Sequence, residues 1–554
     1  MKISSWCYLA LGLGLGTCVS AQTLASQPEK KMNVVFFLVD DMGWSDVGYE
    51  GSQFYETPNI DQFAKQGVRF SQAYAACSVC SPSRASILTG EYPARLHLTD
   101  YLPGRLDKPF QKEKNAVTMQ HLPYDQPTLP EVLKENGYRT AIFGKWHLGE
   151  DTNSTQRQGF ELHIPDWNKG WPNDTYFSPY GMKGLEGGVN GEYLTDRLTT
   201  EALKWITTNK DKPFFLYLAN FAVHDPIQGR GDLVVKYDKK LNKLSKAGEL
   251  PRTPPYILEG NPDDPNPPSQ ADLAALLHNK NYQGFSLLPR RTVKIKQHQD
   301  NTQFAAMVES TDESLGRVLA KLKELGIADN TVVIFFSDNG GMSGANFFSP
   351  RRVISPVALD KAYATSNLPL RGGKGWLYEG GIREPLIIYW PQASNNGTAC
   401  DVPVISTDFY STILDLVGLR PLTNKENGVD GRSLVPLLKQ DQAGADQLSR
   451  RALYWHYPHY SNHGAQSPCG AVRSGDYKLI EYYENNAVQL FNIKTDPGEQ
   501  HDLAQTEPDK VKELTAMLHD WRKSVNADMP TPNPNWKPNK NWPAPSAESV
   551  NDDP

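Results

Sequence analysis

The sequence predicts an α/β fold: a large, mainly parallel sheet covered by helices, followed by a smaller C-terminal α+β domain with an antiparallel sheet. Two observations lead to this prediction. Continuous apolar runs alternate with amphipathic segments over most of the chain, which is typical of strands buried on both faces between helices. After about residue 425 the runs are short and separated by tight turns, which favours an antiparallel sheet.

The elements of the first part follow from periodicity. Strands are expected at 33–39, 68–74, 138–143, 213–221, 331–336 and 385–390. Helices are expected at 58–66, 128–136, 192–209, 302–325 and 406–418. The stretches 150–190 and 225–300 show little periodicity and are expected to be irregular, rich in loops.

The second part is predicted from short strands and one helix. The strands are expected at 453–455, 471–473, 477–480 and 488–491, and the helix at 508–525. The resulting organisation is a signal peptide at 1–21, a catalytic domain at 22–425, a C-terminal subdomain at 426–530 and a tail rich in Pro, Asn and Trp at 531–554.

Composition and the N-terminus limit the function classes. The 57 basic and 63 acidic residues give a net charge of −6, so a nucleic-acid partner is not expected. Lys2, an apolar run at 6–15 and small residues at 19–21 predict an export signal. We therefore expect a periplasmic or secreted protein, with lipid attachment at Cys18 as a poorer match. No later apolar run is long enough for an integral membrane segment.

The cysteines allow several interpretations. Cys77 and Cys80 are spaced like half of a zinc or redox site, but no second such pair or matching histidine pair accompanies them. An exported context permits a disulfide between Cys400 and Cys469, although sequence alone does not show one.

The stretch from Cys80 to Gly90 is the most specific segment of the chain. Ser81 can cap a helix, Pro82 suits its first turn, and Gly90 can end it. Cys80 is then a nucleophile-type side chain at a helix N-terminus, where anions are favoured, and Arg84 follows one turn later. The structural alternative is a buried cysteine without reactivity.

Charged and polar residues follow the C-terminal ends of four predicted strands. They are Asp40, Asp41, Lys145, His147, His224, Asp338 and Asn339. In open α/β sheets this edge carries the ligand crevice. Each residue alone would be interpreted as a surface residue or a cap, but together they predict one site. The four oxygen donors suit Ca²⁺ better than Mg²⁺, and neither zinc nor copper.

The remaining groups of this site suit transfer of a charged group. Lys145, Lys374 and Arg84 can surround a tetrahedral anion, and His147 and His224 can move protons near neutral pH. A nucleophile, a metal, cations and histidines together predict sulfuryl or phosphoryl transfer.

Several motifs resemble type I, formylglycine-dependent sulfatases of the alkaline phosphatase superfamily. The similarity covers residues 33 to about 500. It rests on Leu38 to Gly43, Cys80 to Gly90, Gly144 to Gly149, His224, Ser337 to Gly340, Gly373-Lys374 and Glu379 to Pro385. Glu384 stands where many relatives have an apolar residue. The family's polar sulfate contact between Lys145 and His224 has no assignable counterpart.

The resemblance implies a modified residue and a metal. Cys80 would be oxidised by a formylglycine-generating enzyme, and the aldehyde would hydrate to a gem-diol. By the same resemblance, one Ca²⁺ would be held by Asp40, Asp41, Asp338, Asn339 and residue 80.

The resemblance also implies proton roles. One hydroxyl of the gem-diol would attack sulfur, and His224 and Lys374 would assist the leaving oxygen. His147 would deprotonate the second hydroxyl to expel sulfate, while Arg84 and Lys145 stabilise negative charge.

The substrate is predicted only as a class. The stretch Pro93 to Tyr101 resembles arylsulfatase A-like carbohydrate sulfatases of polysaccharide-degrading bacteria. It implies exo-removal of sulfate from a glycan of the galactose, fucose or uronic acid type. Candidate sugar contacts are Asp100, Trp167, His456 and His459, for which ordinary packing is the alternative. Competing functions are a phosphate or phosphonate ester hydrolase of the same superfamily, and an inactive protein that binds sulfated glycans.

Overall fold

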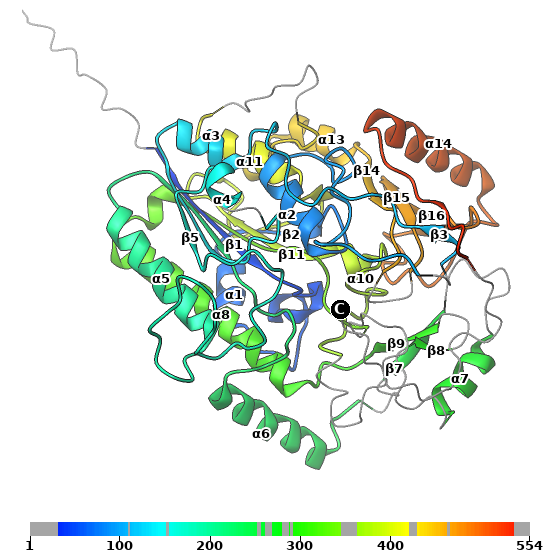
Figure 1. Ribbon diagram of the computed structural model, residues 1–554, viewed down its shortest axis with the longest axis horizontal. Helices are drawn as coiled ribbons and strands as arrows, with labels where there is room; N and C mark the ends of the chain where they lie inside the picture. Colours follow the sequence, from blue (N-terminus) through cyan, green and yellow to red (C-terminus); the bar gives the residue numbers. More distant parts are fainter. Residues whose placement is uncertain are drawn as a thin grey trace, which may run out of the picture. The chain divides into compact units, whose positions relative to one another are not determined.

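A nine-stranded sheet forms the centre of the fold in this computed structural model (Figure 1). Its main path follows the order β12-β2-β11-β10-β1-β6-β4-β5, and β13 pairs with β2. The strands are β1 (Asn33–Val39), β2 (Val68–Tyr74), β4 (Arg139–Gly144), β5 (Leu162–Ile164), β6 (Phe214–Ala219), β10 (Thr331–Ser337), β11 (Arg383–Tyr389), β12 (Ala399–Cys400) and β13 (Val404–Ile405). Only β11 is antiparallel to its neighbours, β10 and β2, so the sheet is mainly parallel, as predicted.

The structure describes residues 31–108, 111–150, 154–251, 256–260, 269–279, 287–288, 292–344, 363–419, 429–461 and 466–536. The predicted signal peptide at 1–21, with Cys7 and Cys18, lies outside the described residues, as do the predicted boundary at 425 and the end of the tail.

Helices cover both faces of the sheet because β1 is buried on both. Val35, Phe37 and Val39 pack into one apolar core with α1 (Pro58–Ala64), α5 (Leu194–Asn209) and α8 (Thr302–Glu324). The alternate side chains of β1 pack into a second core with α2 (Cys80–Thr89), α3 (Leu129–Glu135) and α11 (Asp408–Leu416). This alternation follows from the period of two along a strand, and it places a layer of helices on each face.

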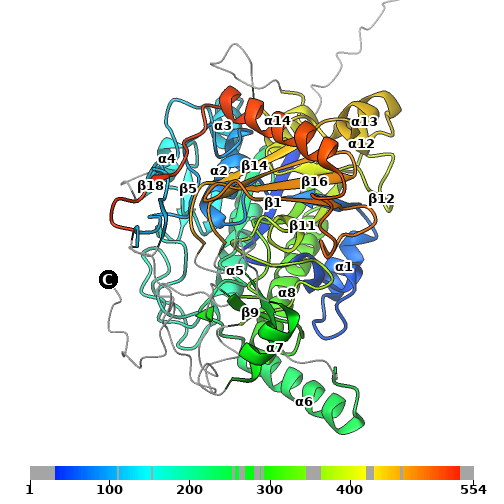
Figure 2. The same cartoon turned by 90° about the vertical axis from the view of Figure 1, so that its right-hand side faces the viewer.

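The C-terminal part forms a second, antiparallel sheet (Figure 2). Its order is β14 (Leu453–Tyr457), β15 (Cys469–Ser474), β16 (Tyr477–Tyr482) and β17 (Val488–Asn492). Helix α14 (Pro508–Ser524) packs on this sheet through Leu514, Leu518 and Trp521. The same apolar core includes Cys77, Val79 and Trp376, so this sheet supports the segments that precede Cys80 and follow Lys374.

The prediction of an irregular stretch at 225–300 is wrong. The segment contains α6 (Gly231–Ala247), β7 (Tyr256–Glu259), α7 (Gln270–His278), β8 (Leu287–Leu288) and β9 (Thr292–Lys296). In α6, Leu233, Tyr237 and Leu241 recur every four residues and pack on the core below α8, so the helical period was present among the lysines. The stretch 150–190 likewise contains α4 (Ser154–Arg157) and β5.

Short elements complete the described chain. They are β3 (Glu113–Lys114), α10 (Glu379–Ile382), α12 (Val435–Leu438), α13 (Gln442–Ser449) and β18 (Thr531–Pro532), with 3-10 turns at Trp44–Asp46, Gly48–Glu50 and Ala328–Asn330. Cys400 and Cys469 lie on strands of different sheets, and no disulfide joins them. Among the described helices, none is both long and apolar enough to cross a membrane.

Candidate active site

The predicted site residues meet at one edge of the large sheet. β1, β10, β4 and β6 end at this edge and lead into the segments of Asp40, Asp338, Lys145 and His224. β2 ends at the same edge and leads to Cys80, whereas β11 begins there after the loop that carries Lys374. The convergence follows from parallel pairing, because the C-terminal ends of parallel strands share one edge.

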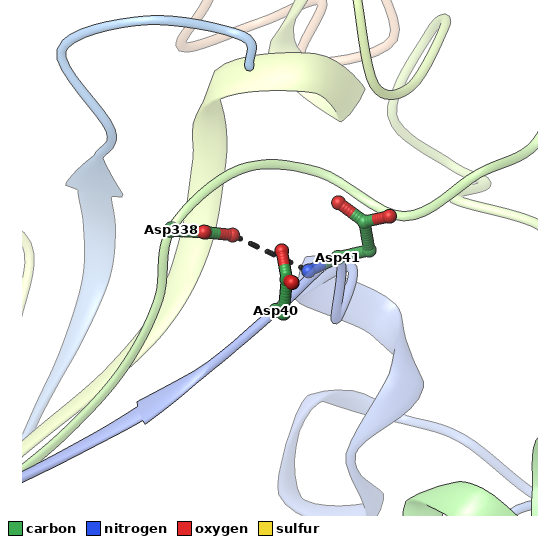
Figure 3. A group of neighbouring side chains, drawn as sticks. All are labelled: Asp40, Asp41 and Asp338. Atoms are coloured by element: carbon green, nitrogen blue, oxygen red, sulfur yellow. Dashed lines mark hydrogen bonds between the residues drawn. The ribbon is translucent and has the colours of Figure 1, made fainter. Parts of the chain in front are cut away.

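Three buried carboxylates form an acidic cluster at the ends of β1 and β10 (Figure 3). Asp40, Asp41 and Asp338 offer oxygen atoms that all lie within 4.8 Å of one another. The backbone nitrogen of Asp41 donates to Asp338 Oδ1 over 3.3 Å. Two further observations indicate a cation: Asp40 Oδ1 and Asn339 Oδ1 are buried and accept no hydrogen bond in the described structure. Three carboxylates and an amide oxygen are ligands that a hard divalent cation prefers, so these residues could hold such an ion.

Three cations surround the acidic cluster. Lys145 Nζ donates to Asp40 Oδ2 over 2.6 Å, and Lys374 Nζ donates to Asp41 Oδ2 over 2.8 Å. Arg84 Nε donates to Asp338 Oδ2 over 2.8 Å. Burial raises the pKa of Asp41, but Lys374, His224 and Lys145 outweigh it and hold this pKa well below its usual range. Asp41 is therefore ionised near neutral pH, and each of the three carboxylates is paired with one of the three cations.

Cys80 is the first residue of α2, with Val79 as the N-cap. The prediction that Ser81 caps this helix is wrong, because Ser81 Oγ instead accepts from Leu102 N over 3.1 Å. The other predicted features hold: Gly90 ends the helix in the left-handed region at φ 71°.

His147 contacts Cys80 directly. Its Nδ1 lies 3.2 Å from Cys80 Sγ, and its Nε2 lies 2.7 Å from the carbonyl oxygen of Leu102. A carbonyl only accepts, so Nε2 carries the proton and Nδ1 presents a lone pair to residue 80. Burial, together with the charge of Lys145, lowers the pKa of His147 well below its usual value. His147 is thus a neutral base aimed at residue 80.

His224 has the opposite character. Its Nδ1 lies 2.8 Å from Asp225 Oδ1, and its Nε2 lies 3.7 Å from Asp41 Oδ2. Burial and Lys374 lower its pKa, but Asp41, Asp225 and Asp40 outweigh them and raise it to about 9. His224 is therefore protonated near neutral pH, and its pKa has moved away from that of His147. Such a divergence distinguishes an acid from a base.

Three supporting features were not predicted from the sequence. Asp225 partners His224, the Leu102 carbonyl partners His147, and Gly170 packs on the His147 ring, where an added Cβ would lie 2.3 Å from Cε1. Of these three, only Asp225 could have been suspected from the sequence, because it directly follows His224 near the end of a strand. The backbone of Asp41 and of His147 lies in the left-handed region, at φ 61° and 58°, a conformation that is uncommon for non-glycine residues and recurs at functional sites.

The four candidate sugar contacts lie in different surroundings. Asp100 and His459 are buried beside each other, with Asp100 Oδ2 3.8 Å from His459 Nδ1. His456 is buried, and its ring nitrogens lie 2.7 Å from Tyr483 Oη and 2.8 Å from the Asp528 carbonyl, an arrangement that suits packing. Trp167 is half-buried and donates to the carbonyl of Trp171 over 2.7 Å.

Two family models match the chain. The model described as "Sulfatase" matches residues 32–419, which includes every residue of the cluster described above. The model described as "N-sulphoglucosamine sulphohydrolase, C-terminal" matches residues 373–527.

Curated proteins and solved structures give similar results. An N-acetylgalactosamine-6-sulfatase of Mus musculus is 30% identical, covering 86% of this chain and 77% of the relative. An N-acetylglucosamine-6-O-sulfatase of Bacteroides thetaiotaomicron is 26% identical, and the similarity covers 94% of this chain and 90% of the relative. The protein in the crystal structure of Ps i-CgsB in complex with k-i-k-neocarrahexaose is 26% identical in sequence. The two structures superpose with a TM-score of 0.61 over 89% of this chain and 93% of that chain.

Proposed function

The chain belongs to the sulfatase family, and from that premise we propose that it removes sulfate esters in exo fashion from a sulfated polysaccharide or oligosaccharide, using Ca²⁺ and formylglycine formed from Cys80. It is a sulfuric ester hydrolase, since the family model covers most of the chain and the curated relatives are named sulfatases. The carbohydrate substrate is supported by those relatives, which are named for 6-sulfated amino sugars.

One observation carries the proposal: two buried histidines of opposite protonation flank the acidic cluster. The lone pair of His147 Nδ1 faces residue 80 over 3.2 Å, so His147 can accept a proton from a hydroxyl there. The protonated His224 presents Nε2 toward Asp41, on the side of the site where Lys374 also lies. From this position His224 can donate a proton to the oxygen that leaves sulfur.

The absent groups supply the remaining chemistry. A hydrated aldehyde at residue 80 would supply a nucleophilic oxygen, and a divalent ion held by Asp40, Asp41, Asp338 and Asn339 would neutralise negative charge on the sulfate oxygens. The thiol of Cys80 contacts His147, and the Asp40 and Asn339 oxygens that accept no hydrogen bond fit the ion.

The cations hold the reacting charges in place. Lys374 is fixed by Asp41 and can polarise the leaving oxygen, whereas Lys145 and Arg84 are fixed by Asp40 and Asp338 and can face the sulfate. Positive side chains held in a water-poor site stabilise developing negative charge without reorganisation.

Mass spectrometry of the Cys80 peptide tests the modification directly. We expect CH₂SH to be replaced by an aldehyde in protein made with a formylglycine-generating enzyme. Cys80→Ala should fold and hydrolyse no sulfate ester, and Cys80→Ser should also be inactive unless the host converts serine. Full activity of Cys80→Ala would exclude the proposed mechanism.

The role of His224 is tested by comparing leaving groups. His224→Ala should reduce turnover of a sugar sulfate by about 10²–10⁴-fold, and turnover of an aryl sulfate much less, because a phenolate leaves without a proton. Equal losses on both substrates would remove His224 from the acid role. Paired sulfate and phosphate esters of one alcohol separate this activity from that of a phosphate or phosphonate ester hydrolase.

Export and domain organisation complete the proposal. Residues 1–21 would direct the chain to the periplasm or the medium after a formylglycine-generating enzyme has acted on the unfolded Cys80 segment. Residues 22–425 would form the catalytic domain and 426–530 a supporting subdomain. The packing of the antiparallel sheet on Val79 and Trp376 supports this division of roles.

A further inference from the structure

Leu102, in the segment that carries Asp100, contacts two neighbours of Cys80. The Leu102 nitrogen donates to Ser81 Oγ over 3.1 Å, and the Leu102 carbonyl accepts from His147 over 2.7 Å. Consecutive Cα atoms are about 3.8 Å apart, so the Cα of Asp100 lies within about 7.6 Å of that of Leu102. Asp100 is therefore close to the segment that contacts Ser81 and His147, and Cys80 is among the groups whose charge raises the pKa of Asp100.

Asp100 and His459 each use one polar atom inside the protein. Asp100 Oδ1 accepts from the Tyr101 nitrogen over 2.9 Å and from Tyr457 Oη over 3.1 Å. His459 Nε2 lies 2.8 Å from Thr99 Oγ1. These contacts fix both side chains, so their remaining atoms point in defined directions.

The second polar atom of each side chain has no hydrogen-bond partner in the described structure. Asp100 Oδ2 and His459 Nδ1 are both buried and unbonded, and they lie 3.8 Å apart, which is too far for a direct hydrogen bond. Both residues are 1% exposed, close to the 2% of Cys80. An acceptor and a ring nitrogen at this separation can both hydrogen-bond to one oxygen that lies beside the line joining them, and buried polar groups normally have such a partner.

We propose that Asp100 and His459 together bind one sugar hydroxyl of the substrate, close to the sulfated carbon. The hydroxyl donates to Asp100 Oδ2 and accepts from the Nδ1–H of His459, while the Thr99 hydroxyl donates to Nε2 and fixes this tautomer. A hydroxyl fits because it both donates and accepts. In the free enzyme a water molecule can occupy the position and be displaced. The inference rests on the proposed function, and it adds a specificity determinant that the reacting groups do not supply.

The experiment compares substrates with and without sugar hydroxyls. We would measure kcat/KM for wild type, Asp100→Ala and His459→Gln with 4-nitrophenyl sulfate and with the 6-sulfates of N-acetylglucosamine and N-acetylgalactosamine. Removing one partner leaves a buried polar group unsatisfied, which costs more than the hydrogen bond itself contributes, so each variant should lose about 10–100-fold on the preferred sugar sulfate. Both should stay within about threefold of wild type on the aryl sulfate, which has no hydroxyl to bind.

Monodeoxy analogues of the preferred sugar sulfate identify the hydroxyl. Removing the bound hydroxyl should cost wild type about the same factor as either substitution, and it should cost the variants nothing further, since the two changes delete one interaction. His519→Gln, a matched change on α14, should behave like wild type on every substrate. If Asp100→Ala does not fold, His459→Gln and the wild-type deoxy series still decide.

Two outcomes separate this inference from the proposed function. Wild type that hydrolyses no sulfate ester would refute the sulfatase mechanism itself. The hydroxyl site alone would be refuted if wild type hydrolyses both substrate classes and the variants lose the same factor in kcat/KM on the sugar sulfate and on the aryl sulfate. It would also be refuted if the losses of the variants and of every deoxy analogue add. Either result would assign the pair to a structural role, with a bound water between the two side chains.

Discussion

Two clusters of buried charge differ in how their acidic oxygens are partnered. In the second cluster, Lys478 Nζ lies 3.1 Å from Glu379 Oε1 and 3.0 Å from Glu499 Oε1. The other oxygens accept from Tyr74 Oη and from the Glu379 nitrogen, each over 2.7 Å. Each carboxylate oxygen of this cluster therefore has a donor or the Lys478 cation within 3.1 Å, although Glu499 Oε1 itself accepts no hydrogen bond.

The cluster at the strand ends is not complete in this sense. Asp41 and Asp338 accept hydrogen bonds at both oxygens. Asn339 Oδ1 and Asp40 Oδ1 accept none, and Asp40 Oδ1 has its ion-pair partner, Arg84 Nη2, at 3.8 Å. Both clusters are equally buried, so burial does not distinguish a functional site from a structural one. The distance to the nearest partner does, because a buried oxygen with no donor or cation at hydrogen-bond distance costs free energy unless a ligand completes it.

The largest expected effect is the loss of metal-dependent activity in Asp338→Ala. Losing the cation removes several kcal/mol of charge stabilisation, so we expect turnover to fall by about 10³-fold or more. Ca²⁺ should raise the Tm of wild type, as any ligand of the native state does, and should not raise that of the variant. The exposed Asp329→Ala is the matched control. A variant, or an EDTA-treated wild type, that kept full turnover would contradict the metal assignment.

Lys478→Met, in contrast to Asp338→Ala, should reduce stability rather than metal-dependent activity. It leaves Glu379 and Glu499 buried without their shared cation, which should reduce the free energy of unfolding by about 3–5 kcal/mol. Lys494→Met is the control: this side chain is 72% exposed, so the substitution should change the free energy of unfolding by less than about 0.5 kcal/mol. Urea unfolding in EDTA measures both. A loss under about 1 kcal/mol would mean that the second cluster is not a structural ion pair.

Gly170→Ala tests whether distances in the first cluster matter. The added Cβ would displace the His147 ring, and with it Nδ1 from residue 80. A misplacement of about 1 Å can cost about 10²-fold in rate, so kcat should fall by this order while the Tm changes little. Gly231→Ala, where a Cβ meets nothing within 4 Å, should be neutral. Unchanged kcat in Gly170→Ala would show that the ring can shift without consequence.

The sequence predicted most of the first cluster and none of the second. Asp40, Lys145 and Asp338 follow apolar strands, and parallel strands end at a common edge, so local pattern and topology together implied their meeting. Lys478 lies within an apolar strand of a different sheet, and its partners are the first residue of the short helix α10, Glu379, and a loop residue, Glu499. Their contact depends on how the two sheets pack, which periodicity does not encode.

The same reason explains the other misses. Gly170 and Leu102 reach His147 from segments with no regular period, and α6 was missed because lysines obscured its Leu and Tyr positions. Helix and strand assignments succeeded where one apolar face dominates, as in α8 with its Asn301 cap, whose Oδ1 accepts from Gln303 N and Phe304 N over 3.1 Å.

Glu384 belongs to neither cluster and provides the smallest predicted effect. It is 0% exposed, and both carboxyl oxygens are buried without a hydrogen-bond partner in the described structure. Burial, with the nearby charges of Asp338, Asp46 and Asp41, raises its pKa well above the usual value. The folded protein therefore binds a proton that the unfolded chain releases above its own pKa. Stability from this group is fully present below the unfolded pKa and is lost as pH rises toward the folded pKa.

Glu384→Gln removes this titration while keeping the shape of the side chain. In EDTA, its free energy of unfolding should exceed that of wild type by at least about 1 kcal/mol at pH 7, and the difference should grow with pH above about 4.5. Urea unfolding at pH 5, 6 and 7 measures this trend, with the exposed Glu324→Gln as the control. Since Glu384 touches no proposed reacting group, kcat should change little. A difference that is constant with pH would mean that Glu384 is ionised in the folded protein and is held by a cation, which would make it an extension of the first cluster.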